Sequence, residues 1–458
     1  MLPQNLDETI IAVSTPPGFG GLGIVRLSGP RALPLALRIF KPRQGKAKIL
    51  PLRAALGDLV GFDGKTYDEG FLTYFKAPRS YTREDIAEIS CHGSPVILEE
   101  AVRLGIKAGA RHAHPGEFTL RAYLHGRIDI MQAEAVQALI SAASLEQAKI
   151  AYGQLEGSLS LKIAAFREKL VGLLVRVEAR LEFPDERLQI SSKQIAAALQ
   201  ETIDFMRGLI SSHEAGRALT EGVTLAIVGR TNVGKSTLFN ALVEKDRAIV
   251  TPFPGTTRDY LREKIIIGGT LFNLVDMAGL GKASHPVEKE GMRRGHRLAR
   301  GADGILLLLD SSRKESRQDL ELIETYGGLK TLIVLNKIDL PRKVSRDKIK
   351  AASGRALLLE VSALKGQNIQ KLRDKLSAFF APKPREGEDV ILHARQKAIL
   401  EQIQGCLEGG LRLMREGHTD EIFVEEIREA VPLLGQLTGE IRSDEVIQNI
   451  FDRFCVGK

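Results

Sequence analysis

A glycine-rich segment that ends in lysine and serine could bind phosphate groups. The sequence "GRTNVGKS", residues 229–236, directly follows the apolar segment "TLAIV". Where such a segment joins a strand to a helix, its N–H groups can surround phosphates, the lysine can reach the terminal phosphates, and the serine can bind Mg²⁺. A plain glycine turn remains an alternative for this motif alone. The predicted phosphate-binding residues are Gly229, Asn232, Val233, Gly234, Lys235, Ser236 and Thr237.

Two further segments supply the metal side of such a site. "PGTTRD" at residues 254–259 offers Thr257 to the metal and the third phosphate, and "DMAG" at 276–279 offers Asp276 to the metal and Gly279 to the phosphate. Their order after the lysine is the one that a phosphate-hydrolysing domain requires. The residue after Gly279 is Leu280, which cannot orient the attacking water as a glutamine does in small GTPases. Another residue must therefore do this.

The base is predicted by two segments nearer the C-terminus. In "NKID" at residues 336–339, Asn336 and Lys337 precede Asp339, whose carboxylate can accept hydrogen bonds from the amino and imino groups of guanine. Adenine lacks this pair of donors. "SAL" then provides Ser362 and Ala363 for the remaining base-binding loop. The sequence therefore predicts that the nucleotide is GTP.

The elements that must position these residues alternate between strand and helix. Between residues 221 and 380, short apolar segments such as "GILLLLD" and "TLIVLN" are separated by helical stretches, which predicts a mostly parallel sheet covered by helices. Residues 1–119 are rich in glycine and proline with short alternating segments, typical of a mixed α/β domain. Residues 120–220 and 381–458 have helical spacing. We therefore expect a helical domain made of two segments, with a P-loop domain inserted between them.

Length and composition limit the class of protein and its cellular compartment. A length of 458 residues predicts several domains, and no apolar stretch is long enough for a membrane span. Three cysteines in this length favour the reducing cytoplasm over a disulfide framework. The formal charge of +8 is compatible with a polyanionic partner, although no long basic run stands out.

Two patterns near the N-terminus are rejected as sites. "GFGGLG" at residues 18–23 follows two prolines and precedes an apparent strand, whereas a dinucleotide-binding turn must precede a helix. The spacing of Cys91, His92, His112 and His114 fits no zinc pattern, so we expect no zinc.

The chain ends in "FCVGK", residues 454–458, which is no prenylation box because Gly457 and Lys458 stand in the wrong places. Taken alone, this tail reads as a frayed terminus with an incidental thiol.

The whole chain resembles the MnmE family of tRNA modification GTPases, also called TrmE. The resemblance rests on "STPPGFGGLGIVRLSGP" at 14–30, "SYTREDIAEISCHGSPVILE" at 80–99, "PGEFTLRAYLHGRIDIMQAEAVQALI" at 115–140, "DMAGLGKASHPVEKEGMRRG" at 276–295, and the terminal "FCVGK". Arg83 stands where the family usually has glycine.

For the P-loop domain, the resemblance implies a potassium ion beside the phosphates that does the work of an arginine finger. The ion would be held by Asn232, Thr251, Phe253 and Thr256, and the water-positioning carboxylate falls on Glu288. It also implies that two P-loop domains dimerise when GTP is hydrolysed.

For the N-terminal domain, the resemblance implies a homodimer that binds 5-formyl- or methylene-tetrahydrofolate. The contacts would be Arg26, Glu88, Arg127 and the terminal Lys458. The tail would then be part of a site, with Cys455 either a nucleophile toward the uracil ring or a packed small residue.

The implied function is a potassium-dependent GTPase that works with an FAD-containing partner in a heterotetramer. Together they would add a carboxymethylaminomethyl or aminomethyl group to carbon five of the wobble uridine of certain tRNAs. Two alternatives stay open: a GTPase of ribosome assembly, and a folate-dependent one-carbon transferase with a regulatory P-loop domain.

Overall fold

The computed structural model describes most of the chain and divides it into two compact units. The described residues are 7–43, 49–182, 191–243, 262–277, 298–327, 330–354, 356–381, 390–441, 444–452 and 454–458. One unit comprises residues 1–137, 153–200 and 405–458, and the other comprises 138–152 and 201–404. The dividing lines therefore run through four helices, which are α4 (Ile130–Ile140), α5 (Leu145–Leu155), α7 (Ser192–Thr220) and α13 (Ala394–Arg415).

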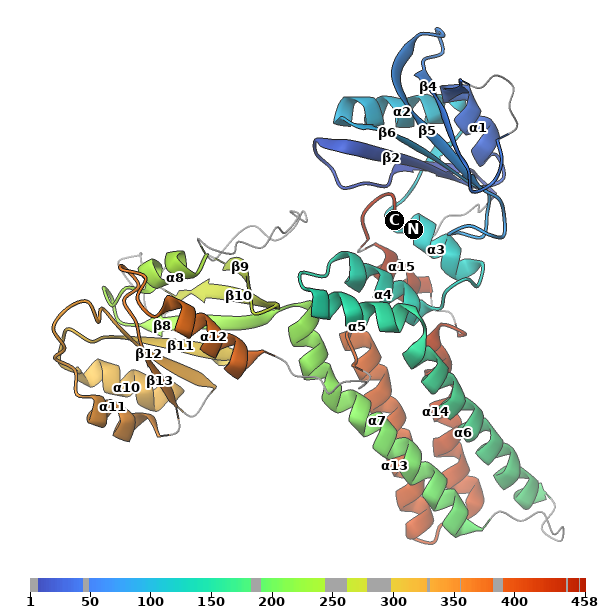
Figure 1. The fold of residues 1–458 in the computed structure, drawn as a ribbon. Helices are drawn as coiled ribbons and strands as arrows, with labels where there is room; N and C mark the ends of the chain where they lie inside the picture. Colours follow the sequence, from blue (N-terminus) through green and yellow to red (C-terminus); the bar gives the residue numbers. More distant parts are fainter. Residues whose placement is uncertain are drawn as a thin grey trace, which may run out of the picture. The chain divides into compact units, whose positions relative to one another are not determined.

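A seven-stranded sheet forms the N-terminal part of the first unit (Figure 1), in the order β3-β4-β5-β6-β2-β1-β7. Its strands are β1 (Ile10–Val13), β2 (Gly20–Ser28), β3 (Phe40–Pro42), β4 (Ala54–Val60), β5 (Thr66–Phe75), β6 (Ile86–Gly93) and β7 (Arg111–His112). All pairs are antiparallel except β1 with β7.

Two helices cover one face of this sheet, α1 (Ala32–Ile39) and α2 (Pro95–Ala108). The alternation predicted for "IAEISCHG" is visible in β6, where Ala87, Ile89 and Cys91 enter the core shared with both helices. Glu88 therefore points to the opposite face, because successive side chains of a strand alternate.

Helices make up the rest of the first unit and continue into the second. They are α3 (Glu117–Leu124), α4 (Ile130–Ile140), α5 (Leu145–Leu155), α6 (Ser158–Glu182), α7 (Ser192–Thr220), α13 (Ala394–Arg415), α14 (Asp420–Thr438) and α15 (Asp444–Phe451). Within the first unit α6 packs along α14, and ion pairs join Arg428 to Glu178 at 2.7 Å and Arg180 to Asp420.

A six-stranded sheet forms the core of the second unit, in the order β13-β12-β11-β8-β10-β9. Its strands are β8 (Val223–Gly229), β9 (Arg262–Ile267), β10 (Thr270–Asp276), β11 (Gly304–Asp310), β12 (Thr331–Asn336) and β13 (Leu357–Glu360). All neighbours are parallel except β9 with β10.

Helices cover both faces of the second sheet (Figure 1). Side chains of α8 (Lys235–Val243) and α12 (Ile369–Phe380) belong to one core, and those of α10 (Arg317–Tyr326) and α11 (Arg346–Ser353) to the other. Strands buried on both sides read as continuous apolar segments, which is why "GILLLLD" has no alternation.

The predicted fold class is confirmed: an α/β N-terminal part, helices from two distant segments, and a P-loop domain between them. The expected domain limits near residues 119, 220 and 380 stay predictions. In the part of the chain that the structure describes, every helix is too short or too polar to cross a membrane.

Candidate functional site

The predicted phosphate-binding loop lies where it was expected, between the end of β8 and the start of α8. The Lys235 side chain lies inside the loop, and its Nζ donates to the main-chain oxygens of Gly229 at 2.8 Å and Arg230 at 2.7 Å. Burial lowers the pKa of Lys235 from its ordinary value, while Asp276 opposes that shift. Thr237 is exposed in the first turn of α8.

Two oxygen ligands of the predicted metal site lie together. The Ser236 hydroxyl donates to Oδ2 of Asp276 at 3.3 Å, which joins the start of α8 to the end of β10. Hydroxyl and carboxylate oxygens are the hard ligands that Mg²⁺ prefers, so this pair fits the expected ion.

Asn336 joins three segments that are predicted to bind the nucleotide and are far apart in the sequence. Its side chain is buried; Nδ2 donates to the main-chain oxygen of Val233 at 2.9 Å, and Oδ1 accepts from the Ala363 N–H at 2.9 Å. Gly234 must remain glycine, since its φ is +99° and a Cβ there would lie 2.3 Å from Asn336 Nδ2. The loop conformations therefore depend on one another.

Lys337 makes a second connection to the phosphate-binding loop. Its Nζ lies 2.7 Å from the main-chain oxygen of Asn232, which has a left-handed φ of +64°, and 2.7 Å from Asp310 Oδ2. Burial alone would raise the pKa of Asp310, but hydrogen bonds from Lys337 and Ser312 lower it below its ordinary value. Asp310 is therefore a carboxylate partner that sequence reasoning missed.

The remaining residues predicted to bind the base follow the C-terminal ends of β12 and β13. Asp339 is exposed, so its carboxylate is free to contact a ligand from solvent. Ser362 is fully buried, and its Oγ accepts from the Lys365 N–H at 3.1 Å. Thr251, Phe253, Thr256, Thr257, Gly279 and Glu288 lie outside the described residues, and their roles stay predictions.

A second candidate site lies on the N-terminal sheet, centred on Arg26 and Glu88. These residues are register partners on β2 and β6, and Arg26 Nε donates to Glu88 Oε1 at 2.7 Å. Their side chains are 18% and 20% exposed, so the pair is sheltered yet reachable. The pairing explains why the two predicted residues lie together although 62 positions separate them.

Aromatic rings line this second site, and sequence reasoning gave them no role. The Arg26 guanidinium lies 5.8 Å from the ring centre of Tyr81 and 5.5 Å from that of Phe118. Arg127 lies 4.8 Å from the Tyr81 ring, and its NH1 donates to the Tyr81 main-chain oxygen at 2.9 Å. The Tyr81 ring thus contacts two of the arginines predicted to bind the carrier.

The C-terminal tail is bonded to the N-terminal part of the same unit. Val456 pairs with Pro115 as an antiparallel bridge, and the main-chain oxygens of Cys455 and Lys458 accept from the Gly116 N–H at 3.3 Å and the Phe118 N–H at 3.2 Å. The Ser14 hydroxyl donates to the Gly457 oxygen at 3.0 Å. These bonds do not fit a frayed terminus.

The tail brings its lysine to the second site. Burial lowers the pKa of Lys458 from its ordinary value, the positive charge of Arg26 lowers it further, and Cys455 and Glu88 oppose the shift. Cys455 itself is exposed. The predicted residues Arg26, Glu88, Arg127 and Lys458 therefore gather around one surface, on which Tyr81 also lies.

Two of the four residues that were rejected as zinc ligands, Cys91 and His92, lie in different environments. Cys91 lies in the core of the sheet, where burial raises its pKa to about 12. His92 is exposed, with Nδ1 2.6 Å from Asp68 Oδ1.

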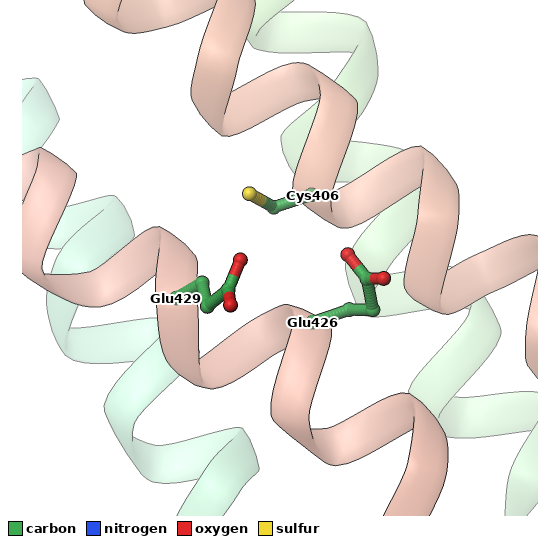
Figure 2. Close-up of side chains that lie close together, drawn as sticks. All are labelled: Cys406, Glu426 and Glu429. Atoms are coloured by element: carbon green, nitrogen blue, oxygen red, sulfur yellow. The ribbon is translucent and has the colours of Figure 1, made fainter.

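A separate group joins α13 and α14 (Figure 2), where one ligand atom each of Cys406, Glu426 and Glu429 lies within 4.8 Å of the others. Burial and the two carboxylates raise the pKa of Cys406. Exposed acidic groups are common without an ion, so we assign no metal to this group.

Comparison with known proteins gives matches over nearly the whole chain. Residues 9–127 match the family model of the GTP-binding protein TrmE N-terminus, and residues 130–455 match that of the MnmE helical domain. Three curated relatives are named tRNA modification GTPase MnmE. That of Thermoanaerobacter pseudethanolicus is 38% identical over 98% of this chain and 99% of its own length. Those of Koribacter versatilis and Aquifex aeolicus are 39% and 40% identical, each over 99% of this chain and 100% of their own length.

Identity at this level over the full length, together with both family models, shows the family. The chain belongs to the MnmE (TrmE) family.

Proposed function

We propose that this protein is a potassium-dependent GTPase that modifies tRNA together with an FAD-containing partner. The product is a carboxymethylaminomethyl or aminomethyl group on carbon five of the wobble uridine, with glycine or ammonium as the source of nitrogen. Family membership supports this proposal, because the relatives are named tRNA modification GTPases. The main structural support is that one chain contains both parts. Asn336 connects the predicted nucleotide-binding loops by hydrogen bonds, and the C-terminal tail is hydrogen-bonded to the N-terminal part with Lys458 near Arg26.

In the nucleotide site, Lys235 would bind the terminal phosphates and Asp339 would bind guanine. Ser236 and Asp276 are the described residues that would hold Mg²⁺, and Asn232 is the described residue that would contact K⁺. When bound, these cations neutralise charge that develops on the phosphates. We assign orientation of the attacking water to Glu288.

In the second site, the residue types suit a tetrahydrofolate that carries a formyl or methylene group. The Glu88 carboxylate can accept from the amide-like donors of a pterin, and Arg26, Arg127 and Lys458 attract the negative glutamate tail. Cys455 is exposed next to Lys458, and we assign it as the nucleophile toward the uracil ring.

The two parts act in sequence in this proposal. GTP hydrolysis drives closure of paired P-loop domains and rearranges a cytoplasmic complex of a homodimer with two copies of the partner. Chemistry on the base takes place at the flavin and folate sites.

Two measurements test the nucleotide site and the folate site of this proposal separately. GTP hydrolysis is measured in KCl and in NaCl at equal ionic strength, and binding of 5-formyltetrahydrofolate is measured by titration calorimetry for the full chain and for a chain ending at residue 454. Faster hydrolysis in KCl, with carrier binding lost on truncation, is the expected result.

The alternatives predict other results. Equal hydrolysis in the two salts contradicts the potassium assignment. Full-length protein that binds no folate favours ribosome assembly, and modified tRNA made without the flavoprotein favours a one-carbon transferase.

A further inference from the structure

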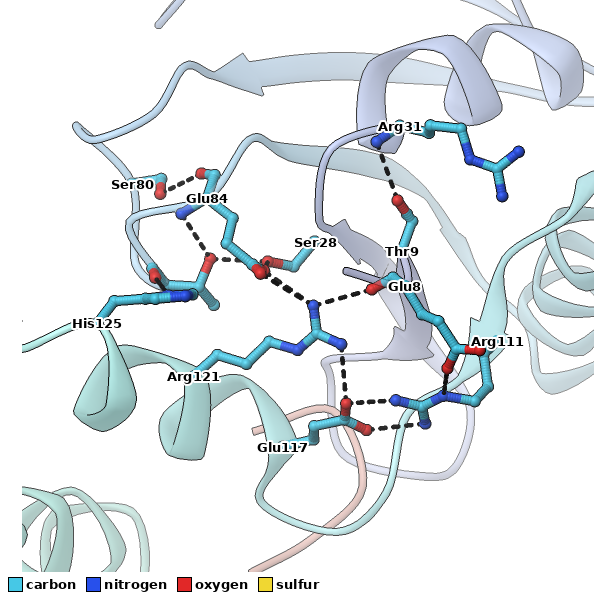
Figure 3. Close-up of polar contacts among 11 residues, drawn as sticks. Glu8, Thr9, Ser28, Arg31, Ser80, Glu84, Arg111, Glu117, Arg121 and His125 are labelled. Atoms are coloured by element: carbon cyan, nitrogen blue, oxygen red, sulfur yellow. Dashed lines mark hydrogen bonds and ion pairs between the residues drawn. The ribbon is translucent and has the colours of Figure 1, made fainter. Parts of the chain in front are cut away.

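A network of charged side chains joins Glu84 and Glu8 to helix α3 (Figure 3). Its centre is Arg121 on α3, whose side chain is fully buried, as is that of Glu117. Arg121 NH1 donates to both carboxylate oxygens of Glu84, at 3.0 and 3.1 Å, and to the main-chain oxygen of Glu8 at 2.9 Å. Its NH2 donates to Glu117 Oε1 at 2.9 Å. One guanidinium therefore joins three separate segments of the chain.

The network continues to the surface through Arg111. Arg111 NH1 and NH2 donate to Glu117 at 3.0 and 2.5 Å, and its Nε donates to Glu8 at 2.7 Å. Burial alone would raise the pKa of Glu117, but hydrogen bonds from Arg111, the His114 N–H and Arg121 lower it. Both oxygens of the Glu117 carboxylate therefore accept hydrogen bonds.

Stability alone is a weak reason for such a network. Removing charges from water is costly, and well-packed apolar residues often replace a buried ion pair without loss. What the network adds is a fixed geometry, because the planar guanidinium presents several donors in set directions. The relevant question is which segments that geometry fixes.

One fixed segment is the loop that carries Tyr81. Glu84 ends this loop: its Oε2 accepts from the Ser28 hydroxyl at 2.7 Å, and its main-chain oxygen accepts from Ser80. The buried Thr82 Oγ1 lies 2.7 Å from Ser28 Oγ in the same arrangement. Glu84 therefore fixes the main chain of the loop that carries Tyr81, and the Tyr81 hydroxyl itself lies 2.9 Å from Thr119 Oγ1 of α3.

The other fixed segment is the first turn of α3, which holds the tail. Glu117 lies between Gly116 and Phe118, whose N–H groups donate to the tail at Cys455 and Lys458. Arg121 thus contacts, through two carboxylates, the loop on one side of the candidate carrier site and the attachment of the tail on the other.

We propose that Arg121 is a positioning residue that sets the tail and the Tyr81 loop at the separation needed to bind the folate carrier. The inference rests on the proposed function, in that the carrier binds at this surface. Arg121 contacts neither the tail nor Tyr81 through the bonds described, so it acts through Glu117 and Glu84.

Arg121→Lys tests this role, because lysine keeps the charge but offers one nitrogen where three segments need donors. Binding of 5-formyltetrahydrofolate to the full chain is measured by titration calorimetry. We expect a dissociation constant raised about tenfold or more with unchanged stoichiometry. Hydrogen exchange of peptides covering residues 113–124 should become faster in the ligand-free variant. Arg103→Lys, an exposed arginine paired with Glu100 on α2, is the matched control and should match wild type.

The measured number of binding sites distinguishes a positioning role of Arg121 from a role in folding. A merely structural role lowers the number of binding sites and leaves the affinity of the folded fraction unchanged, and this outcome would overturn the inference. So would equal affinity in Arg121→Lys and wild type. If Arg121→Lys does not fold, Glu84→Gln replaces it, and unchanged affinity in that variant overturns the inference equally. Wild type that binds no folate defeats the proposed function itself, and the inference with it.

Discussion

Gly457→Ala should detach the tail from its position. Gly457 has a φ of +95°, and a Cβ there would lie 1.9 Å from the Val13 oxygen and 2.8 Å from the Val13 carbonyl carbon. Real Cβ atoms essentially never come within 3.0 Å of such atoms, so the tail must move by roughly 1 Å. A left-handed conformation adds about 1–2 kcal/mol for alanine.

Movement of this size breaks the bonds that hold the tail. The Ser14, Gly116 and Phe118 donors each lose a hydrogen bond worth about 0.5–1.5 kcal/mol. Together with the backbone strain, these losses amount to about 2.5–6.5 kcal/mol against the attached tail, which raises its open fraction about 60- to 40,000-fold.

Hydrogen exchange of the tail and of residues 113–124 measures this opening. Gly64→Ala is the matched control, since Gly64 also has a positive φ, +77°, but nothing within 4 Å of an added Cβ. Exchange in Gly457→Ala equal to that in wild type would refute the reasoning, because the steric contact would then be tolerated without displacement. Binding of 5-formyltetrahydrofolate should weaken in Gly457→Ala and not in Gly64→Ala.

Three further results are expected. Asp339→Asn should weaken GTP binding about 10- to 100-fold in a competition assay through loss of a charge-assisted contact to guanine, and unchanged affinity would refute the base assignment. At pH 8 iodoacetamide should alkylate the exposed Cys455 in the folded protein and spare Cys91, whose pKa is about 12; mass spectrometry showing Cys91 modified first would contradict its burial. Because folding lowers the pKa of Glu117, its ionised carboxylate stabilises the fold at pH values above 4.5, the ordinary pKa, and this stabilisation is lost as the pH falls through the folded-state pKa. The free energy of unfolding in urea should therefore depend less on pH below 4.5 in Glu117→Gln than in wild type.

The second sheet and the positions of its loops could be predicted from the sequence because the patterns that indicate them are local. Continuous apolar segments predict buried parallel strands, and the motif at residues 229–236 fixes where a strand meets a helix. The dependence of these loops on Asn336 was not accessible, because its bonds to Val233 and Ala363 join residues 103 and 27 positions away.

The second site was less predictable for the same reason. Resemblance supplied Arg26, Glu88, Arg127 and Lys458, whereas Tyr81 stood unassigned within "SYTREDIAEISCHG". No local pattern shows that a tyrosine of one loop will contact two arginines that are distant in the sequence. Likewise, Arg121 reads from sequence as a charged helix residue, and only the folded chain shows it to be fully buried.

Arg83 shows how structure explains a departure noted in the sequence. The resemblance implies glycine at this position, and the φ of Arg83 is +62°, a left-handed conformation that glycine adopts without strain. Its NH1 donates to the His125 main-chain oxygen at 2.8 Å, a bond that glycine could not make. The side chain thus partly offsets the backbone cost.

The most direct test of the central claim is the content of modified uridines in tRNA. Total tRNA is digested and quantified by mass spectrometry from cells that lack this gene and from cells complemented with wild type, Asp339→Asn, or a chain that ends before Cys455. We predict that the wobble modification is lost in the deletion and restored by wild type alone. Unchanged modified uridines in the deletion, with no second copy of the gene present, would contradict the tRNA assignment.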